Sequence, residues 1–127
     1  MEKIIVMPML FPNSLEGTTL WASEDVFVWL HGMRNADERR KHEGKLQFFC
    51  NSNFRLFMPD IIKREYGKTY GIHVGQCRVA GFFDQSYRDF IAIDCFVKKK
   101  QRNDQRMSAI YEKVDGIRET GLWTRER

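Results

Sequence analysis

A histidine and several basic residues lie close together in the C-terminal half of this sequence, next to stretches with the alternation of β-strands. His73 and Arg78 flank a short turn at Gly75-Gln76, so we expect them to be neighbours across two antiparallel strands. Both side chains would point away from the apolar core, onto an exposed face of the sheet. The next predicted strand ends in a basic run that consists of Lys98, Lys99, Lys100, Arg102 and Arg106.

Side chains of these types could bind and cleave RNA without a metal ion. One group would take the proton from the ribose 2′-hydroxyl, cations would stabilise the pentavalent phosphorane, and another group would protonate the leaving 5′-oxygen. Crowding by like charges would lower the pKa of a lysine and make it a better acid or base at neutral pH. Because Lys98 and Lys99 close the strand beside His73 and Arg78, we expect them to extend the same positive site.

Each of these residues also has a purely structural interpretation. A lysine run at a strand end is often a solvated edge that protects a sheet against aggregation. A lone histidine on a strand, such as His73, is commonly a hydrogen-bonded surface residue. Arg78 could simply form an ion pair across the sheet with Asp84 or Asp94.

The sequence contains none of the short motifs of the common nucleotide-dependent, hydrolytic or zinc enzymes. A P-loop, G-x-G-x-x-G, G-x-S-x-G and H-E-x-x-H are all absent. The histidines His31, His42 and His73 are far apart, and no cysteine–histidine spacing is typical of a zinc site. We therefore predict neither a metal nor a cofactor.

Composition predicts a single globular domain over residues 1–127, with 43% hydrophobic residues and no apolar run long enough to span a membrane. The three cysteines form no C-x-x-C pair, which is typical of a protein in the reducing cytoplasm. The net charge is +4, and the excess lies in residues 64–127, with 13 Lys and Arg against 9 Asp and Glu. This asymmetry favours an acidic partner such as nucleic acid, although modest basicity also occurs in proteins that bind nothing charged.

Hydrophobic patterning predicts the order strand, helix, helix, three strands, helix. Ser23 is the expected N-cap of the first helix, and Asn35 opens a capping box for the second. The expected strands cover 4–12, 70–74, 77–83 and 90–98, and the last helix runs from 103 or 104 to a cap at Gly121. This order predicts an α+β fold with a small, mostly antiparallel sheet, an N-terminal helical hairpin and a C-terminal helix.

The stretch from Met58 to Asp104 resembles the RelE/ParE superfamily of bacterial toxins, in particular its phage-related HigB-like branch. The resemblance covers most of the chain from about Ser23, whereas the first 22 residues have no clear counterpart. It depends on the order and spacing of short motifs, which are Lys63, Gly67, Gly71-Ile72-His73-Val74, Cys77-Arg78-Val79 and Phe96-Val97-Lys98-Lys99.

The resemblance implies a RelE-like, microbial-RNase-like fold and the toxin of a type II toxin–antitoxin system. Such toxins cleave mRNA on the ribosome through a metal-independent basic site and are inhibited by an antitoxin, here expected to be a helix-turn-helix protein. The partners would be this antitoxin, the ribosome and mRNA, in the cytoplasm and away from membranes. The expected catalytic residues are Arg78, His73, Lys98 and Lys99, and the expected RNA-binding residues are Lys100, Arg102, Arg106 and Lys63.

Two alternatives belong to other functional classes. The superfamily also contains inhibitors of DNA gyrase that cleave nothing, so the chain could be a non-catalytic inhibitor of a host protein. It could also be a basic nucleic-acid-binding domain without toxicity, whose affinity would fall steeply with salt.

Overall fold

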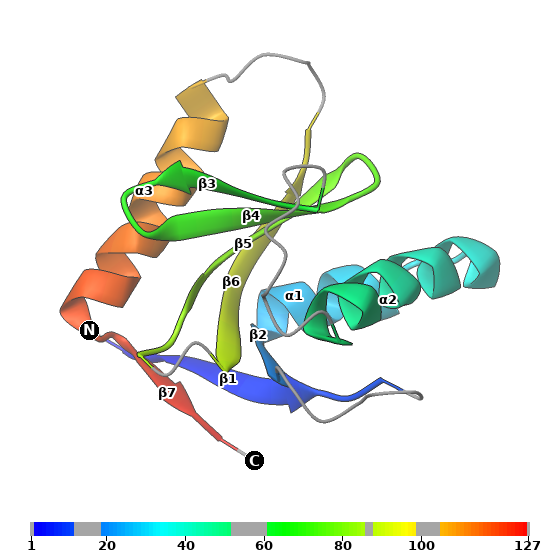
Figure 1. Cartoon of the computed structure of the whole chain (residues 1–127), viewed down its shortest axis with the longest axis horizontal. Coiled ribbons are helices and arrows are strands. Elements are labelled where there is room, and N and C mark those ends of the chain that lie inside the picture. The colour runs from blue at the N-terminus through cyan, green and yellow to red at the C-terminus, as the bar shows by residue number, and fades with distance from the viewer. Residues whose placement is uncertain (1, 12–18, 52–60, 86–87, 99–104, 127) are drawn as a thin grey trace.

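The computed structural model describes residues 2–11, 19–51, 61–85, 88–98 and 105–126, and it contains three helices interspersed among seven strands in these ranges (Figure 1). In chain order the elements are β1 (Ile4–Met9), β2 (Thr19–Ser23), α1 (Glu24–His31), α2 (Ala36–Asn51), β3 (Ile62–Tyr66), β4 (Thr69–Val74), β5 (Cys77–Phe83), β6 (Asp89–Val97), α3 (Gln105–Thr120) and β7 (Trp123–Arg125). The fold is therefore α+β.

All seven strands belong to one mixed sheet in the order β3-β4-β5-β6-β2-β1-β7. Neighbouring strands are antiparallel except in two pairs, β2 with β6 and β1 with β7, which are parallel. The central strand β6 has a continuous buried run at Phe90–Ile93, as expected for a strand with neighbours on both sides and helices on both faces.

The predicted RelE-like architecture, with a small, mostly antiparallel sheet, an N-terminal helical hairpin and a C-terminal helix only, is wrong. Two strands precede the first helix, α1 and α2 lie between β2 and β3, and β7 follows α3. The sheet is larger because it includes three strands of at most five residues, β2, β3 and β7. Such short strands carry too few residues to show a clear alternation of apolar and polar side chains.

Two side chains cap the N-termini of α1 and α2 at the positions that the sequence predicts. The Ser23 hydroxyl accepts a hydrogen bond from the Val26 N–H (3.5 Å) and donates one to the Ile93 carbonyl on β6 (2.6 Å). Asn35 Oδ1 accepts hydrogen bonds from the N–H groups of Asp37 (2.9 Å) and Glu38 (3.1 Å). These caps satisfy N–H groups that have no partner within a helix. The Ser23 bond to β6 also fixes the start of α1 on the sheet.

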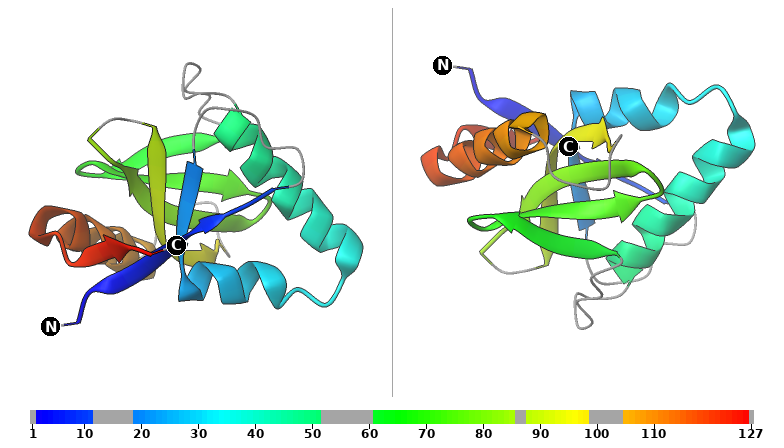
Figure 2. Two further views of the ribbon diagram at one scale, coloured as in Figure 1. Left: turned by 90° about the horizontal axis from the view of Figure 1, so that it is seen from below. Right: turned by 90° about the horizontal axis from the view of Figure 1, so that it is seen from above.

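The helices cover opposite faces of the sheet, with α3 on one side and α2 on the other (Figure 1, Figure 2). Buried residues of α1 and α2 pack in one core with apolar side chains of the sheet, among them Ile72, Val79 and Phe90. Met107, Tyr111 and Val114 of α3 pack in a second core against side chains of the other face, including Phe82 and Phe96. The structure therefore leaves neither face of the central strands uncovered.

Candidate RNA-binding site

His73 and Arg78 are directly paired across β4 and β5, as the sequence predicts. The tight turn between these strands contains Gly75 with φ of +63°, a conformation that favours glycine. Phe96 on β6 pairs with Arg78 from the other side. The row His73–Arg78–Phe96 therefore crosses three adjacent strands on one face of the sheet.

Other predicted cations come from the same end of the sheet. The Lys98 N–H donates to the Gln76 carbonyl (2.7 Å), so Lys98 lies beside the β4–β5 turn. Lys63 near the start of β3 pairs with Gly71 on β4 and is exposed. Arg106 is exposed in the first turn of α3. Three predicted site residues lie outside the described residues: Lys99, Lys100 and Arg102.

The prediction that His73 and Arg78 occupy an exposed face is wrong, because α3 packs over that face. Phe96, in the same row, is only 7% exposed, and its ring contacts the Tyr111 ring edge-on with centroids 5.6 Å apart. His73 and Arg78 are both partly buried. The site is therefore not an open surface: α3 covers Phe96, whereas His73 and Gly75 line a pocket of about 470 Å³ together with residues of α2, among them His42.

The Arg78 guanidinium forms hydrogen bonds with backbone carbonyls of nearby residues and not with a carboxylate. Its Nη1 group donates to the carbonyls of Gly75 (3.0 Å) and Cys77 (2.9 Å). Among the described residues Arg78 forms no ion pair: Asp84 pairs with Arg125 and Asp94 pairs with Lys113 instead. Neutral acceptors fix the guanidinium without cancelling its charge, which leaves that charge available to a phosphate.

Tyr111 of α3 packs next to this site, although the sequence analysis did not assign it there. The Tyr111 hydroxyl is buried and has no hydrogen-bond partner among the described residues. Burial is the main cause that raises the pKa of Tyr111; the nearby Glu65 carboxylate raises the pKa further, and the Arg78 cation opposes this shift. The hydroxyl is therefore protonated at neutral pH.

Gly71 on β4 makes room for this tyrosine. A Cβ atom at position 71 would overlap the Tyr111 hydroxyl and would lie 3.2 Å from Cζ. The sequence shows Tyr111 only as one member of the apolar stripe of its helix. The signal that could have identified it is a tyrosine in a core stripe together with a glycine inside a strand.

A second basic region lies at the opposite end of α3, where a pocket of about 840 Å³ is lined by Arg64, Lys68, Arg118 and Arg125. Two of these cations are already neutralised. Arg118 pairs with Asp115 (3.0 Å) and Glu119 (3.4 Å), whereas Arg125 pairs with Asp84 (2.7 Å) and Asp89 (3.3 Å). These carboxylates would repel a phosphate, so the His73–Arg78 end is better suited to RNA.

Comparison with protein-family models and with curated proteins finds no match to this chain. The described residues contain no group of three or more His, Cys, Asp or Glu side chains placed to hold a metal ion. In the same part of the chain, no helix is both long and apolar enough to cross a membrane.

Proposed function

We propose that this protein is the toxin of a type II toxin–antitoxin pair, an endoribonuclease that inhibits translation by cleaving ribosome-bound mRNA. The main support is the direct pairing of His73 with Arg78 beside Lys98, at a sheet end where Arg78 carries an uncompensated charge. The motifs shared with RelE/ParE toxins run through the same residues. Because its substrate is on the ribosome, the protein acts in the cytoplasm.

In this proposal each residue has a defined role. Arg78 stabilises the phosphorane, and Lys98 and Lys99 bind and polarise the phosphate. His73 serves as general acid or base, a role that typically accelerates a reaction by about 10²–10⁴-fold. The cations around this centre contact flanking phosphates: Lys63, Lys100, Arg102 and Arg106. None of these steps requires a metal ion bound to the protein.

The test is expression of the chain in a bacterial host, followed by mapping of mRNA ends on purified ribosomes. The wild-type chain should arrest growth and produce new mRNA ends, whereas Arg78→Ala combined with Lys98→Ala should do neither. Arg34→Ala combined with Arg40→Ala is the matched control, because it removes two exposed positive charges from the α1–α2 region. Growth arrest that persists in the Arg78/Lys98 variant would contradict the proposed roles.

One observation favours a non-catalytic function as the second candidate. Arg78 is fixed by two backbone carbonyls beside the β4–β5 turn, an arrangement that suits a rigid binding contact as well as catalysis. An inhibitor of a host protein such as DNA gyrase would block DNA supercoiling and leave mRNA intact. A basic nucleic-acid-binding domain would bind RNA or DNA in a salt-dependent manner and cause no growth arrest.

The antitoxin can be sought beside the gene. A small helix-turn-helix protein encoded next to this chain should bind it and restore growth when both are expressed. If the neighbouring protein neither binds the chain nor restores growth, it is not the antitoxin.

A further inference from the structure

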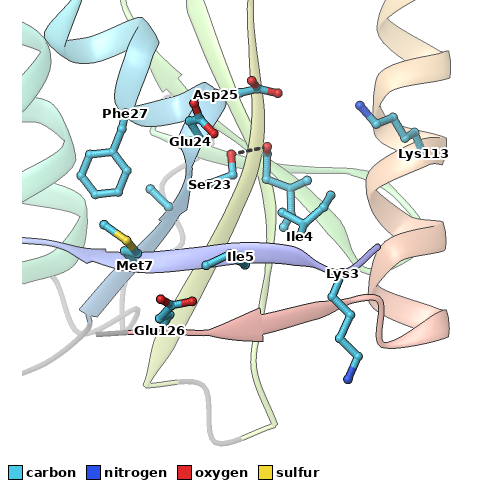
Figure 3. Close-up of a pocket in the computed structure, with 12 residues that line it drawn as sticks. Lys3, Ile4, Ile5, Met7, Ser23, Glu24, Asp25, Phe27, Lys113 and Glu126 are labelled. Carbon is cyan, nitrogen blue, oxygen red and sulfur yellow. Dashed lines mark hydrogen bonds between the residues drawn. The ribbon is translucent and has the colours of Figure 1, made fainter. Parts of the chain in front are cut away.

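A pocket of about 610 Å³ opens where β2 leaves the sheet. β2 lies between β6 and β1 as far as Ser23, and there the chain turns into α1. Beyond this point no described strand separates the first residues of β1 from β6 at Ile93. The resulting notch is bounded by β1, the start of α1 and α3 (Figure 3). It shares no lining residue with the proposed RNA site.

The walls of this notch are largely apolar. Ile5 and Met7 lie on the same face of β1 and are 49% and 46% exposed. Phe27 of α1 stands beside Met7, and Ile4 lies further along β1 (Figure 3). Ala22 and Ile93 also line the pocket. Large apolar side chains that gather around a cavity at the surface are typical of an interaction site.

The rim of the notch is acidic, although the whole chain has a net charge of +4. The carboxylates of Glu24 and Asp25 stand above β1 in Figure 3, and that of Glu126 lies below it. All three residues are exposed, and none forms an ion pair within the described part of the chain. Two lysines also line the notch: Lys113 is already paired with Asp94 (3.4 Å), and the exposed Lys3 side chain extends away from Glu24 and Asp25 (Figure 3).

Asp25 and Asp94 also lie near the Cys95 thiol, which does not line the notch. Burial is the main cause that raises the pKa of the Cys95 thiol to about 12, and the carboxylates of Asp94 and Asp25 add to the shift. Glu24 and Asp25 also stabilise the N-terminus of α1 through its dipole. That role accounts for neither Glu126, which lies after β7, nor the exposed apolar side chains between them.

We propose that this notch binds a basic amphipathic segment of a partner protein. Apolar side chains of that segment would contact Ile5, Met7 and Phe27, and its lysines or arginines would lie near the acidic rim. Complementary charge of this kind mainly provides specificity and a faster association. Nucleic acid does not fit, because the rim would repel phosphates.

Backbone groups of β6 that already form hydrogen bonds favour binding through side chains over the addition of a strand to β6. The Ile93 carbonyl already accepts a hydrogen bond from the Ser23 hydroxyl (2.6 Å), and the Cys95 N–H donates to the Asp94 carboxylate (2.8 Å). Binding of a second copy of this chain at the notch is also unfavourable. A two-fold interface would bring this surface against itself and oppose carboxylates of the same sign.

The test uses the full chain and two fluorescent amphipathic peptides with the same leucine spacing, one with lysine and one with glutamate at the polar positions. Fluorescence anisotropy should show binding of the lysine peptide and at least about tenfold weaker binding of the glutamate peptide. A variant that combines Glu24→Gln, Asp25→Asn and Glu126→Gln should bind the lysine peptide more weakly by a similar factor. The matched control combines Glu38→Gln, Glu43→Gln and Glu112→Gln, which should bind like the wild type.

Because Glu24 and Asp25 also support α1, a second variant leaves the carboxylates in place. The variant with Ile5→Ser and Met7→Ser should bind the lysine peptide more weakly than the wild type does. In the wild type, amide chemical shifts around Ile5, Met7 and Phe27 should change when the peptide binds. The proposal is overturned if the lysine peptide does not bind, or if it binds both the rim variant and the Ile5/Met7 variant as tightly as it binds the wild type. A concentration-dependent dimer that Ile5→Ser with Met7→Ser abolishes, without peptide binding, would assign the notch to a second copy instead.

Discussion

His73 on β4 and Arg78 on β5 are direct partners across the two antiparallel strands. Side chains opposite each other in such a pair have Cβ atoms roughly 4.5–5.5 Å apart. The His73 and Arg78 side chains therefore leave neighbouring points on the same face of the sheet, and the His73 Nε2 atom is buried. Strand pairing, and not a loop, fixes this relationship, which is the basis of the catalytic roles proposed for the two residues.

The contact between Gly71 and Tyr111 predicts a measurable coupling in stability. Gly71→Ala should cost about 1–3 kcal/mol of unfolding free energy, because the new methyl group overlaps the Tyr111 hydroxyl. In a Tyr111→Phe background the same substitution should cost clearly less, because that hydroxyl is absent. Urea denaturation of the four proteins in this cycle measures the coupling, and an equal cost in both backgrounds would contradict the contact.

Gly44 in α2 provides the matched control for this cycle. Apart from its chain neighbours and the adjacent backbone of α2, no described atom lies within 4 Å of a Cβ placed at Gly44. Gly44→Ala should therefore stabilise the protein by about 0.5–1 kcal/mol, because alanine is the better helix former.

The buried carboxylate of Asp115 predicts a pH-dependent stability. Its Oδ1 accepts hydrogen bonds from the Lys68 N–H (3.1 Å), the Thr69 hydroxyl (3.0 Å) and Arg118 Nε (3.0 Å), and these bonds hold the β3–β4 turn on α3. Burial acts to raise the pKa of Asp115, but the hydrogen bonds from Arg118, Lys68 and Thr69 outweigh burial, so the pKa is lowered. The folded state therefore favours the ionised form.

This stabilisation should be complete above the unfolded-state pKa of about 4 and should be lost as the pH falls through the lower folded-state pKa. Asp115→Asn should cost about 1–3 kcal/mol at neutral pH, and the difference from the wild type should shrink in acid. Urea denaturation at several pH values measures it, with the exposed Glu112→Gln on the same helix as the control. A difference that does not change with pH would contradict this account.

How far the sequence predicts the fold depends on the length and pattern of each element. Regular periodicity and capping residues identify the three helices and the strands β4, β5 and β6. β2 has no alternation because it is buried between β6 and β1. β3 is a charged edge strand, and β7 has only three residues, which pair with β1 from the far end of the chain.

The site shows the same division between local and tertiary information. The pairing of His73 with Arg78 follows from two strands joined by a short turn, so the sequence is sufficient to predict it. Burial of this face depends on where α3 packs, which no local pattern specifies. The place of Tyr111 beside Arg78 depends on the same packing and on the small size of Gly71.

RNA binding should depend on salt through the cations at the sheet end. Each phosphate contact on single-stranded RNA contributes about 0.7 to the slope of log K against log salt concentration. Lys63→Ala and Arg106→Ala should each reduce the slope by about this amount, because each removes one exposed cation of the site. Fluorescence anisotropy with a labelled single-stranded RNA measures the slope. Arg34→Ala should leave it unchanged, and an equal loss in that control would mean that binding is not localised at the sheet end.

The most direct test of the proposed function is single-turnover cleavage of mRNA on translating ribosomes by the wild type, His73→Ala, Arg78→Ala and the double variant. We predict that each single substitution lowers the rate by about 10²–10³-fold. The double variant should be little slower than the slower single variant, because the two residues act on the same phosphate. Cleavage at the wild-type rate by either single variant would contradict a catalytic role of the His73–Arg78 pair.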